Sequence, residues 1–143
     1  MTKTCKLGYT QGTFDMFHIG HLNLLKQAKE QCERLIVGVN SDALVEEYKN
    51  KVPVICAADR AEIVRNIKVV DECLVVDTLD KVKVWNDIRF DAIFIGDDWK
   101  GNARWVQTEK DLQPLGADVV YLKHTDEISS TLLRGKEGNK VID

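Results

Sequence analysis

The sequence is poor in several features that define common protein classes. Its 143 residues include two prolines, three histidines and four cysteines. The cysteines are widely spaced, with no CxxC pair and too few neighbouring histidines for a zinc site. We therefore expect reduced, mostly buried thiols, as in cytosolic proteins, and no resident metal centre.

Long apolar runs and a surplus of positive charge are also missing. No run approaches the length of a membrane span, and Met1–Lys6 lacks the apolar core of a signal peptide. The net charge of −3 lacks the basic excess that broad binding to nucleic acid or membrane surfaces needs. We therefore expect a cytoplasmic protein that binds neither nucleic acid nor membranes. Any anionic ligand would be held by a few local hydrogen-bond donors.

The chain has instead the pattern of one α/β domain. A composition of 44% hydrophobic and 30% charged residues suits a globular chain of this length. Short Val, Ile and Leu runs alternate with helical stretches, which indicates a parallel sheet covered on both faces. Neither an internal repeat nor a linker divides the chain, so we expect one domain over residues 1–134 and a polar tail over 135–143. The expected strands are Lys6–Thr10, Leu35–Val39, Cys73–Val76, Ala92–Ile95 and Val119–Leu122.

Capping signals place most of the expected helices. Asp59 followed by Glu62 resembles a capping box and predicts a helix from about Arg60 to Val69. Pro114 and Gly116 end the last helical stretch. The other expected helices are one after the first strand, then Ser41–Tyr48, Lys81–Ile88 and about Trp105–Leu112.

The stretch Gly12–His21 organises the site. It turns from the first strand into a helix, where backbone N–H groups and the helix dipole favour an anion. Gly12 and Gly20 can adopt backbone angles that are barred to other residues. His18 and His21 are three residues apart, so they project from one side of the helix and can donate to phosphate oxygens. The alternative is that His21 merely begins the helix and His18 is packed.

The residues Gly-Thr-Phe-Asp followed by His-Ile-Gly-His resemble the signature of the HxGH nucleotidyltransferases. The block is most similar to the cytidylyltransferase family, in particular to the bacterial glycerol-3-phosphate cytidylyltransferases, and the resemblance runs from about Leu7 to Arg134. Adenylyltransferases and class I aminoacyl-tRNA synthetases carry related motifs. The resemblance implies a Rossmann-like sandwich with helices on both faces and the strand order 3-2-1-4-5.

In that order, ligands bind beyond the carboxyl ends of the first and fourth strands. The first strand delivers the Gly12–His21 turn, the fourth delivers Gly96–Gly101, and the fifth delivers His124–Thr131. The last two loops also have a purely structural interpretation. Gly96–Gly101 can be a solvated surface turn, and the hydroxyl cluster Ser129–Thr131 can be a helix N-cap. Asp97 can accept from a base amino group, and Trp99 either walls the site or covers the core.

The resemblance assigns roles residue by residue. It places His18 and His21 on the phosphates, with Lys49 and Lys51 on the triphosphate and acceptor phosphate, and Arg60 beside the acceptor. The expected nucleotide contacts are Gly12, Thr13, Phe14, Asp15, Gly20, Gly96, Asp97, Trp99, His124, Ile128, Ser129, Ser130 and Thr131.

The chain departs from the family in its last loop. Where the family signature resembles Arg-Thr-Glu-Gly-Ile-Ser-Thr-Thr, this chain has His124, Asp126 and Glu127 in place of arginine, glutamate and glycine. An imidazole lacks the permanent bidentate charge of a guanidinium, so the grip on the phosphates differs. The segment Lys68–Cys73 resembles the family's Arg-Tyr-Val-Asp-Glu-Val dimer segment without its tyrosine, which implies a homodimer.

The resemblance implies transfer of a cytidylyl group from CTP to a small phosphorylated alcohol, with Mg²⁺ on the triphosphate. Glycerol 3-phosphate is the first acceptor, ahead of phosphocholine, phosphoethanolamine and sugar or polyol phosphates. ATP is the second nucleotide. Two other classes stay open: a metallohydrolase with Asp15, His18 and His21 as ligands, and a module that binds a nucleotide without turnover.

Overall fold

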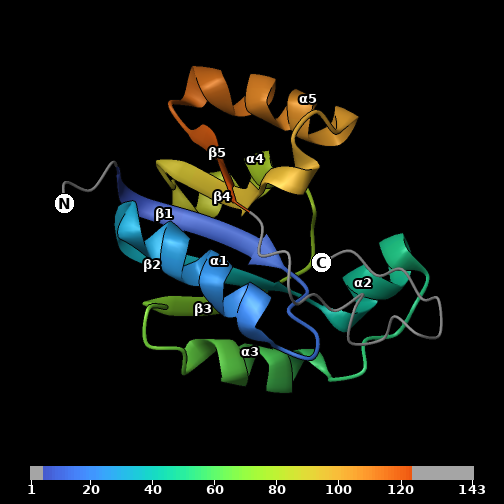
Figure 1. Cartoon of the computed structure of the whole chain (residues 1–143). Coiled ribbons are helices and arrows are strands. Elements are labelled where there is room, and N and C mark those ends of the chain that lie inside the picture. The colour runs from blue at the N-terminus through green and yellow to red at the C-terminus, as the bar shows by residue number, and fades with distance from the viewer. Residues whose placement is uncertain (1–4, 124–143) are drawn as a thin grey trace.

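A sheet of five parallel strands forms the centre of the molecule. The computed structural model describes residues 5–123. The strand order is β3-β2-β1-β4-β5 (Figure 1), as the sequence predicted. The strands are β1 Cys5–Gly12, β2 Cys32–Asn40, β3 Glu72–Val76, β4 Ala92–Gly96 and β5 Asp118–Leu122.

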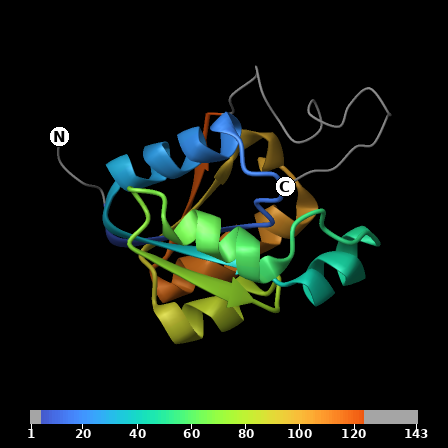
Figure 2. The ribbon, with the colours of Figure 1, turned by 90° about the horizontal axis from the view of Figure 1, so that it is seen from below.

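Helices cover both faces of the sheet. The helices α1 and α3 lie on one face and α4 and α5 on the other, while α2 lies beyond the end of β2 (Figures 1 and 2). Within the described residues, no helix is long and apolar enough to cross a membrane. The helices are α1 Ile19–Glu30, α2 Asp42–Lys49, α3 Ala57–Arg65, α4 Lys81–Ile88 and α5 Ala103–Leu112, with short 3-10 helices η1 Asp97–Trp99 and η2 Gln113–Leu115.

Two apolar cores explain the near-continuous apolar strands. In β2, Leu35, Val37 and Val39 face the core under α1 and α3, whereas Ile36 faces the core under α4 and α5. Alternate residues of a strand point to opposite faces, so a strand buried on both sides needs apolar residues throughout. The edge strands β3 and β5 are only partly buried, unlike the expectation.

Helix α3 begins earlier and ends earlier than predicted. It starts at Ala57, after Cys56 as N-cap, and ends at Arg65. Its first N–H, on Ala57, donates to the Asp42 carboxylate over 3.1 Å. The capping group thus comes from α2, and the local Asp59–Glu62 pattern does not set the start.

Candidate functional site

The two histidines of the turn cap helix α1 together. The Nδ1 atom of His18 accepts from the Gly20 N–H over 3.0 Å, and Nδ1 of His21 accepts from the His18 N–H over 3.2 Å. This is a capping box built from imidazoles. The rings stack with centroids 3.9 Å apart.

These bonds decide which ring nitrogen can donate. An Nδ1 that accepts a hydrogen bond carries no proton, so the neutral imidazole carries its proton on Nε2. Both His18 and His21 therefore have Nε2 as their donor, at the positive end of the α1 dipole. Capping the helix and donating to a phosphate are compatible functions of the same rings.

The unusual backbone of the turn lies at residues other than those predicted. Phe14 and Met16 both have a φ of 53°, in the left-handed region, which is costly for side-chain-bearing residues. Gly12 and Gly20 do not have positive φ. Gly12 instead leaves little room, since a Cβ there would lie 3.1 Å from the Phe14 ring and would require a small shift of that ring.

Asp15 links the turn to the lysine-bearing loop. Its side chain is 2% exposed, and its two carboxylate oxygens accept from the N–H groups of Val54 and Ile55 at 2.8 and 2.9 Å. The sequence suggested a nucleotide contact for this residue. The structure instead uses its carboxylate to hold the segment after Lys51 against the turn.

Arg60 has a structural function in place of the predicted contact with the acceptor. It is 1% exposed, and its guanidinium donates to the carbonyls of Ile55, Thr13 and Asn40 and to the Asp42 carboxylate, all within 2.8 Å. Four of its five N–H groups are thereby used inside the protein. The prediction is wrong because the loop before α3 folds over this side chain.

Asp42 is the charged partner of that guanidinium and the cap of α3. Burial by itself raises the pKa of its carboxyl. The Asp42 carboxylate also accepts hydrogen bonds from the Ala57 N–H and from Arg60, and it lies beside the guanidinium charge. These interactions outweigh the effect of burial and hold the pKa below the ordinary value of 3.8. The sequence reasoning did not single out this residue.

Lys49, expected on the phosphates of the ligands, reaches the turn. Its Nζ lies 3.2 Å from Thr13 Oγ1, which is also 3.0 Å from the Tyr48 hydroxyl. Lys51 has an exposed side chain two residues later. The turn, the end of α2 and the loop after it therefore meet at the carboxyl edge of the sheet.

The end of β4 supplies the second predicted loop. Gly96 is buried, and a Cβ there would lie 2.7 Å from Oδ1 of the exposed Asp98, so a larger residue would require that side chain to move. Asp97 is exposed at the start of η1. Trp99 is partly buried, with the Arg104 guanidinium 5.5 Å from its ring centre.

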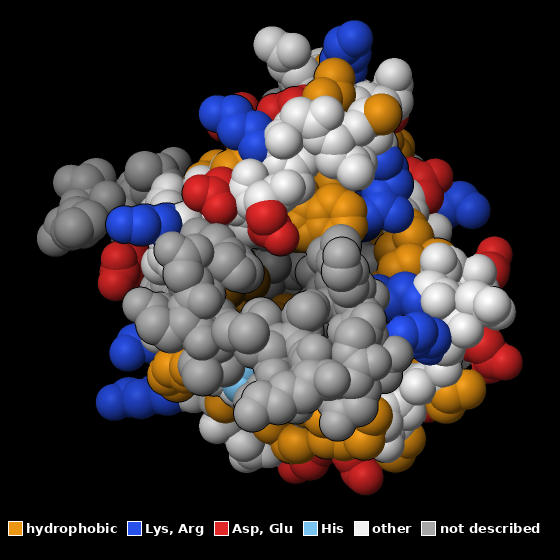
Figure 3. Space-filling view, turned by 45° about the vertical axis from the view of Figure 1, so that its right-hand side comes forward, with side chains coloured by type: hydrophobic (Ala, Val, Ile, Leu, Met, Phe, Trp, Pro, Cys, Tyr) orange, Lys and Arg blue, Asp and Glu red, His pale blue; other side chains and the backbone are white. Residues whose placement is uncertain are grey.

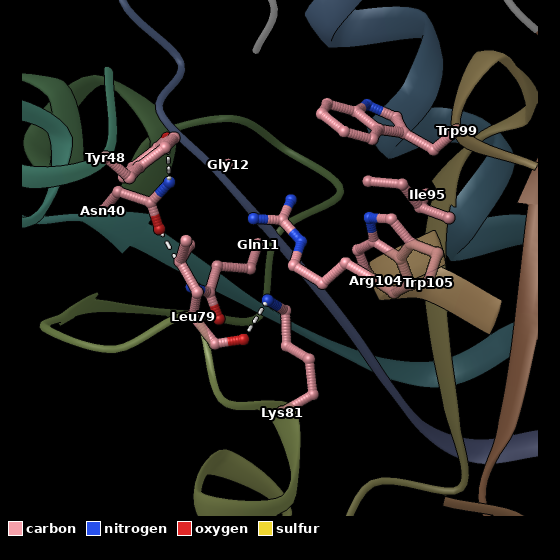
Figure 4. A pocket seen from close by; sticks show the side chains of 10 residues that line it. All are labelled: Gln11, Gly12, Asn40, Tyr48, Leu79, Lys81, Ile95, Trp99, Arg104 and Trp105. Atoms are coloured by element: carbon pink, nitrogen blue, oxygen red, sulfur yellow. Dashed lines mark hydrogen bonds between the residues drawn. The ribbon is translucent and has the colours of Figure 1, made fainter. Parts of the chain in front are cut away.

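A pocket at the same edge is lined by two predicted residues, Gly12 and Trp99, together with residues that sequence motifs did not identify. It opens between β1, β2 and β4 and the starts of α4 and α5 (Figure 4). The face onto which the strands end has Lys and Arg side chains beside hydrophobic ones (Figure 3). The lining residues are Gln11, Gly12, Asn40, Tyr48, Leu79, Lys81, Ile95, Trp99, Arg104 and Trp105.

Lys81 is the buried cation of this pocket. Its side chain is 6% exposed, its Nζ donates to the Leu79 carbonyl over 2.8 Å, and it lies 5.2 Å from the Trp105 ring centre. Burial lowers its pKa from 10.5 to about 8, and the charge of Arg104 acts in the same direction. Nothing in the local sequence marks this lysine, because its burial depends on the packing of α4 against α5.

Part of the predicted site lies outside the described residues. The predictions for the last loop fall there, so the structure does not test them. The residues are His124, Ile128, Ser129, Ser130 and Thr131.

The metallohydrolase alternative finds no support in the donor atoms. The Nδ1 atoms of His18 and His21 and both oxygens of Asp15 accept backbone N–H bonds. Over residues 5–123, no three His, Cys, Asp or Glu side chains form a group that could hold a metal ion.

Comparison with known proteins decides the family. The model of the Cytidylyltransferase-like family matches residues 9–136, which span the histidine turn, the basic loop and the β4 turn. The chain belongs to this family of HxGH nucleotidyltransferases. Nucleotidyl transfer is the class of reaction that this membership supports.

Two kinds of curated relative are similar to this Cytidylyltransferase-like chain. The bifunctional protein HldE of Caulobacter sp. (strain K31) is 38% identical over 138 residues, which are 96% of this chain and 26% of that protein. This chain thus spans about a quarter of that relative's length. The FAD synthase of Thermococcus sibiricus is 32% identical over 126 residues, covering 87% of this chain and 85% of the relative.

Solved structures agree on the fold. The crystal structure of the lipopolysaccharide core biosynthesis protein from Thermoplasma volcanium matches with a TM-score of 0.74 and 25% identity, covering 85% of this chain and 98% of that one. Pantothenate synthetase from Thermus thermophilus matches with a TM-score of 0.63 at 15% identity, over 90% of this chain and 61% of the other, which shows the fold alone.

Proposed function

We propose that this chain transfers a nucleotidyl group from a nucleoside triphosphate to the phosphate of a small phosphorylated alcohol, with release of pyrophosphate. The observation that carries the proposal is the pair of stacked imidazoles at the start of α1, 3.9 Å apart, whose Nδ1 atoms are held by backbone N–H groups. Two fixed Nε2–H donors beside a helix N-terminus suit the oxygens of a reacting phosphate.

The reaction needs positioning and charge stabilisation. A phosphate oxygen of the acceptor attacks the α-phosphorus in line, a new P–O bond forms, and the bond to the bridging oxygen breaks as pyrophosphate leaves. His18 and His21 donate to phosphate oxygens while negative charge grows on them. Lys49 and Lys51 offset the charge of the acceptor and of the leaving group, and Asp15 keeps their loop near the turn.

Mg²⁺ fits this proposal as an ion carried by the triphosphate. It prefers oxygen ligands and often binds substrate phosphates with few protein groups. The donors at the turn are imidazoles, ammonium groups and N–H groups, which suit the phosphates, and Asp15 has both oxygens engaged by backbone. Mg²⁺ supplies charge neutralisation when bound, and the described residues need to hold only the nucleotide.

CTP is the first candidate nucleotide and ATP the second. The family resemblance at Gly96, Asp97 and Trp99 supports CTP, with the Asp97 carboxylate accepting from the amino group of the base. Adenine also has an exocyclic amino group, so this contact alone does not distinguish the two nucleotides. The FAD synthase relatives, named for an adenine dinucleotide, support ATP.

Glycerol 3-phosphate is the first candidate acceptor, by resemblance. The other acceptors are phosphocholine, phosphoethanolamine and sugar or polyol phosphates. A homodimer through the segment 68–73 belongs to the same proposal.

A pyrophosphate-release assay tests this proposal. The protein is incubated with Mg²⁺, each of CTP, ATP, GTP and UTP, and each acceptor in turn. We expect release only when nucleotide and acceptor are both present. Binding of CTP without release under any combination would identify a nucleotide-binding module instead, and release without an acceptor would identify a hydrolase.

A further inference from the structure

The pocket at the carboxyl ends of β1, β2 and β4 is lined by two cations with few partners, Lys81 and Arg104. Over the described residues, Lys81 Nζ makes one hydrogen bond, to the Leu79 carbonyl. The Arg104 guanidinium makes a ring contact with Trp99, and none of the ion pairs of residues 5–123 includes it. The charge of Arg104 disfavours the charge on Lys81, whereas the carboxylate of the preceding residue, Asp80, favours it; burial and Arg104 outweigh Asp80, so the pKa of Lys81 stays lowered. A further negative group in the pocket would therefore stabilise both cations.

The side-chain amides of the pocket are already in use. Gln11 Nε2 donates to Asn40 Oδ1 and to the Thr78 carbonyl, each over 2.9 Å. Asn40 Nδ2 donates to the Tyr48 hydroxyl over 3.0 Å. The indole N–H of Trp105 is buried and has no hydrogen-bond partner among the described residues. It adds a third donor to those of Lys81 and Arg104, and all three suit a group that only accepts hydrogen bonds.

The walls of the pocket strengthen this preference. The rings of Trp99 and Trp105 form one wall of the pocket beside Arg104 (Figure 4), and Lys81 Nζ lies 5.2 Å from the Trp105 ring centre. Apolar walls lower the local dielectric, so a charged group placed between them gains more than it would in water. A neutral hydroxyl would gain much less there than a carboxylate or a phosphate.

The pocket lies next to the expected position of the acceptor phosphate. Tyr48 lines it, and the next residue, Lys49, reaches Thr13 of the turn. Gly12 belongs both to the turn and to the pocket wall. A molecule whose phosphate lies at Lys49 can thus extend its other end toward Lys81.

On the basis of the proposed function, we propose that this pocket receives the far end of the acceptor, and that this end carries a second anionic group held by Lys81 and Arg104. The group is a carboxylate or a phosphate, so the preferred acceptor is a phosphorylated acid or a bisphosphate. A phosphorylated alcohol with a neutral end is then a poorer substrate. This inference deepens the proposal above and changes its ranking of acceptors.

A matched set of acceptors tests the inference in the unmodified protein. Glycerol 3-phosphate has a neutral end, 3-phosphoglycerate has a carboxylate in its place, and glycerol 1,3-bisphosphate has a second phosphate. We expect kcat/KM for at least one of the two acceptors with an anionic end to exceed that for glycerol 3-phosphate by about tenfold or more. Which of the two is faster identifies the group. Equal or better use of glycerol 3-phosphate overturns the inference and leaves the proposed function standing.

Variants assign the preference to the two cations. Lys81→Met and Arg104→Met should each lower the ratio of kcat/KM for the acidic acceptor over the neutral one by about tenfold to a hundredfold. Arg104 is exposed, so its variant tests the inference even if Lys81→Met folds poorly. Matched controls are Lys83→Met on α4 and Lys110→Met on α5, both exposed and away from the pocket lining.

The outcomes separate the two proposals. An unchanged ratio in both pocket variants overturns the inference, as does the same fall in the two control variants. Absence of pyrophosphate release with every acceptor overturns the proposed function itself. If pyrophosphate is released only with acceptors that have a neutral end, the inferred second anionic group is overturned and the proposed function stands.

Discussion

Two cations are buried at the same edge of the sheet, and they differ in what surrounds them. Arg60, 1% exposed, donates to three carbonyls and a carboxylate. Lys81, 6% exposed, donates to one carbonyl and lies near a second cation. A buried charge is stable when the protein supplies its partners. Arg60 therefore stabilises the fold, whereas Lys81 is kept at a cost, as is common for groups that meet a ligand.

The largest expected effect comes from removing the guanidinium of Arg60, which tests whether its contacts stabilise the fold. Arg60→Met leaves the carbonyls of Thr13, Asn40 and Ile55 without their donor, so we expect the free energy of unfolding to fall by about 3–5 kcal/mol. Denaturant unfolding measures this change. Arg65→Met, on the same helix but exposed, should change it by less than about 0.5 kcal/mol. Similar stability of the two variants would show that the Arg60 contacts contribute little.

His18 and His21 serve both the fold and the ligand. Backbone N–H groups hold their Nδ1 atoms, and Nε2 carries the proton that a phosphate oxygen can accept. His18→Ala or His21→Ala should lower kcat about a hundredfold to a thousandfold, because a donor to the reacting phosphate is lost. Steady-state pyrophosphate release measures the loss.

The control at the same position is His18→Asn. Asparagine is a good N-cap, so it should recover the roughly 1 kcal/mol of stability that His18→Ala loses without recovering the rate. Ordinary turnover in either alanine variant would contradict the role assigned to the imidazoles.

The cost of Lys81 should appear in the pH dependence of stability. Its pKa is about 8 in the folded protein and 10.5 ordinarily, so between these values the unfolded chain binds more protons. The stability of the unmodified protein therefore rises with pH across this range, on the order of 3 kcal/mol in all.

Lys81→Met removes this dependence. The variant should be more stable than the unmodified protein below pH 8, and the difference should shrink as the pH rises toward 10.5. Denaturant unfolding at about pH 7, 9 and 10 measures it. A difference that stays constant with pH would show that Lys81 is not destabilised by burial.

The smallest effect concerns Asp42, the carboxylate beside Arg60. Its lowered pKa means that it stabilises the folded protein above about pH 4, and that this contribution is lost as the pH falls further. Asp42→Asn should cost about 1 kcal/mol at neutral pH, since solvent screens this half-exposed group. Acid titration of unfolding should show the two proteins converging as the pH falls below 3.8, with Asp59→Asn as the exposed control on α3.

The fold was predictable because its signals are local or periodic. Short apolar runs indicated the five strands, and the resemblance supplied their order, which the sheet confirms. The start of α3 was not predictable in this way. Its cap, Asp42, precedes Ala57 by 15 residues and belongs to another helix.

The same distinction between local signals and tertiary packing applies to the site. The histidine turn was predictable because sequence neighbours form it, and Lys49 because the loop leads back to Thr13. Lys81 and Arg104 carried no motif, since only the packing of α4 and α5 brings them to one pocket. Arg60 was assigned to the acceptor because sequence alone does not show which side of a loop a guanidinium faces.

The position of Gly12 has a consequence for how a substitution there would act. It ends β1, contacts the ring of Phe14 on the side of the histidines, and faces the space around Lys81 on the other. Since it has no side chain, only main-chain atoms of this residue stand between the two sides. A methyl group here would press on the Phe14 ring, 3.1 Å away, so a Gly12→Ala change would act on the histidine side before it acted on the pocket.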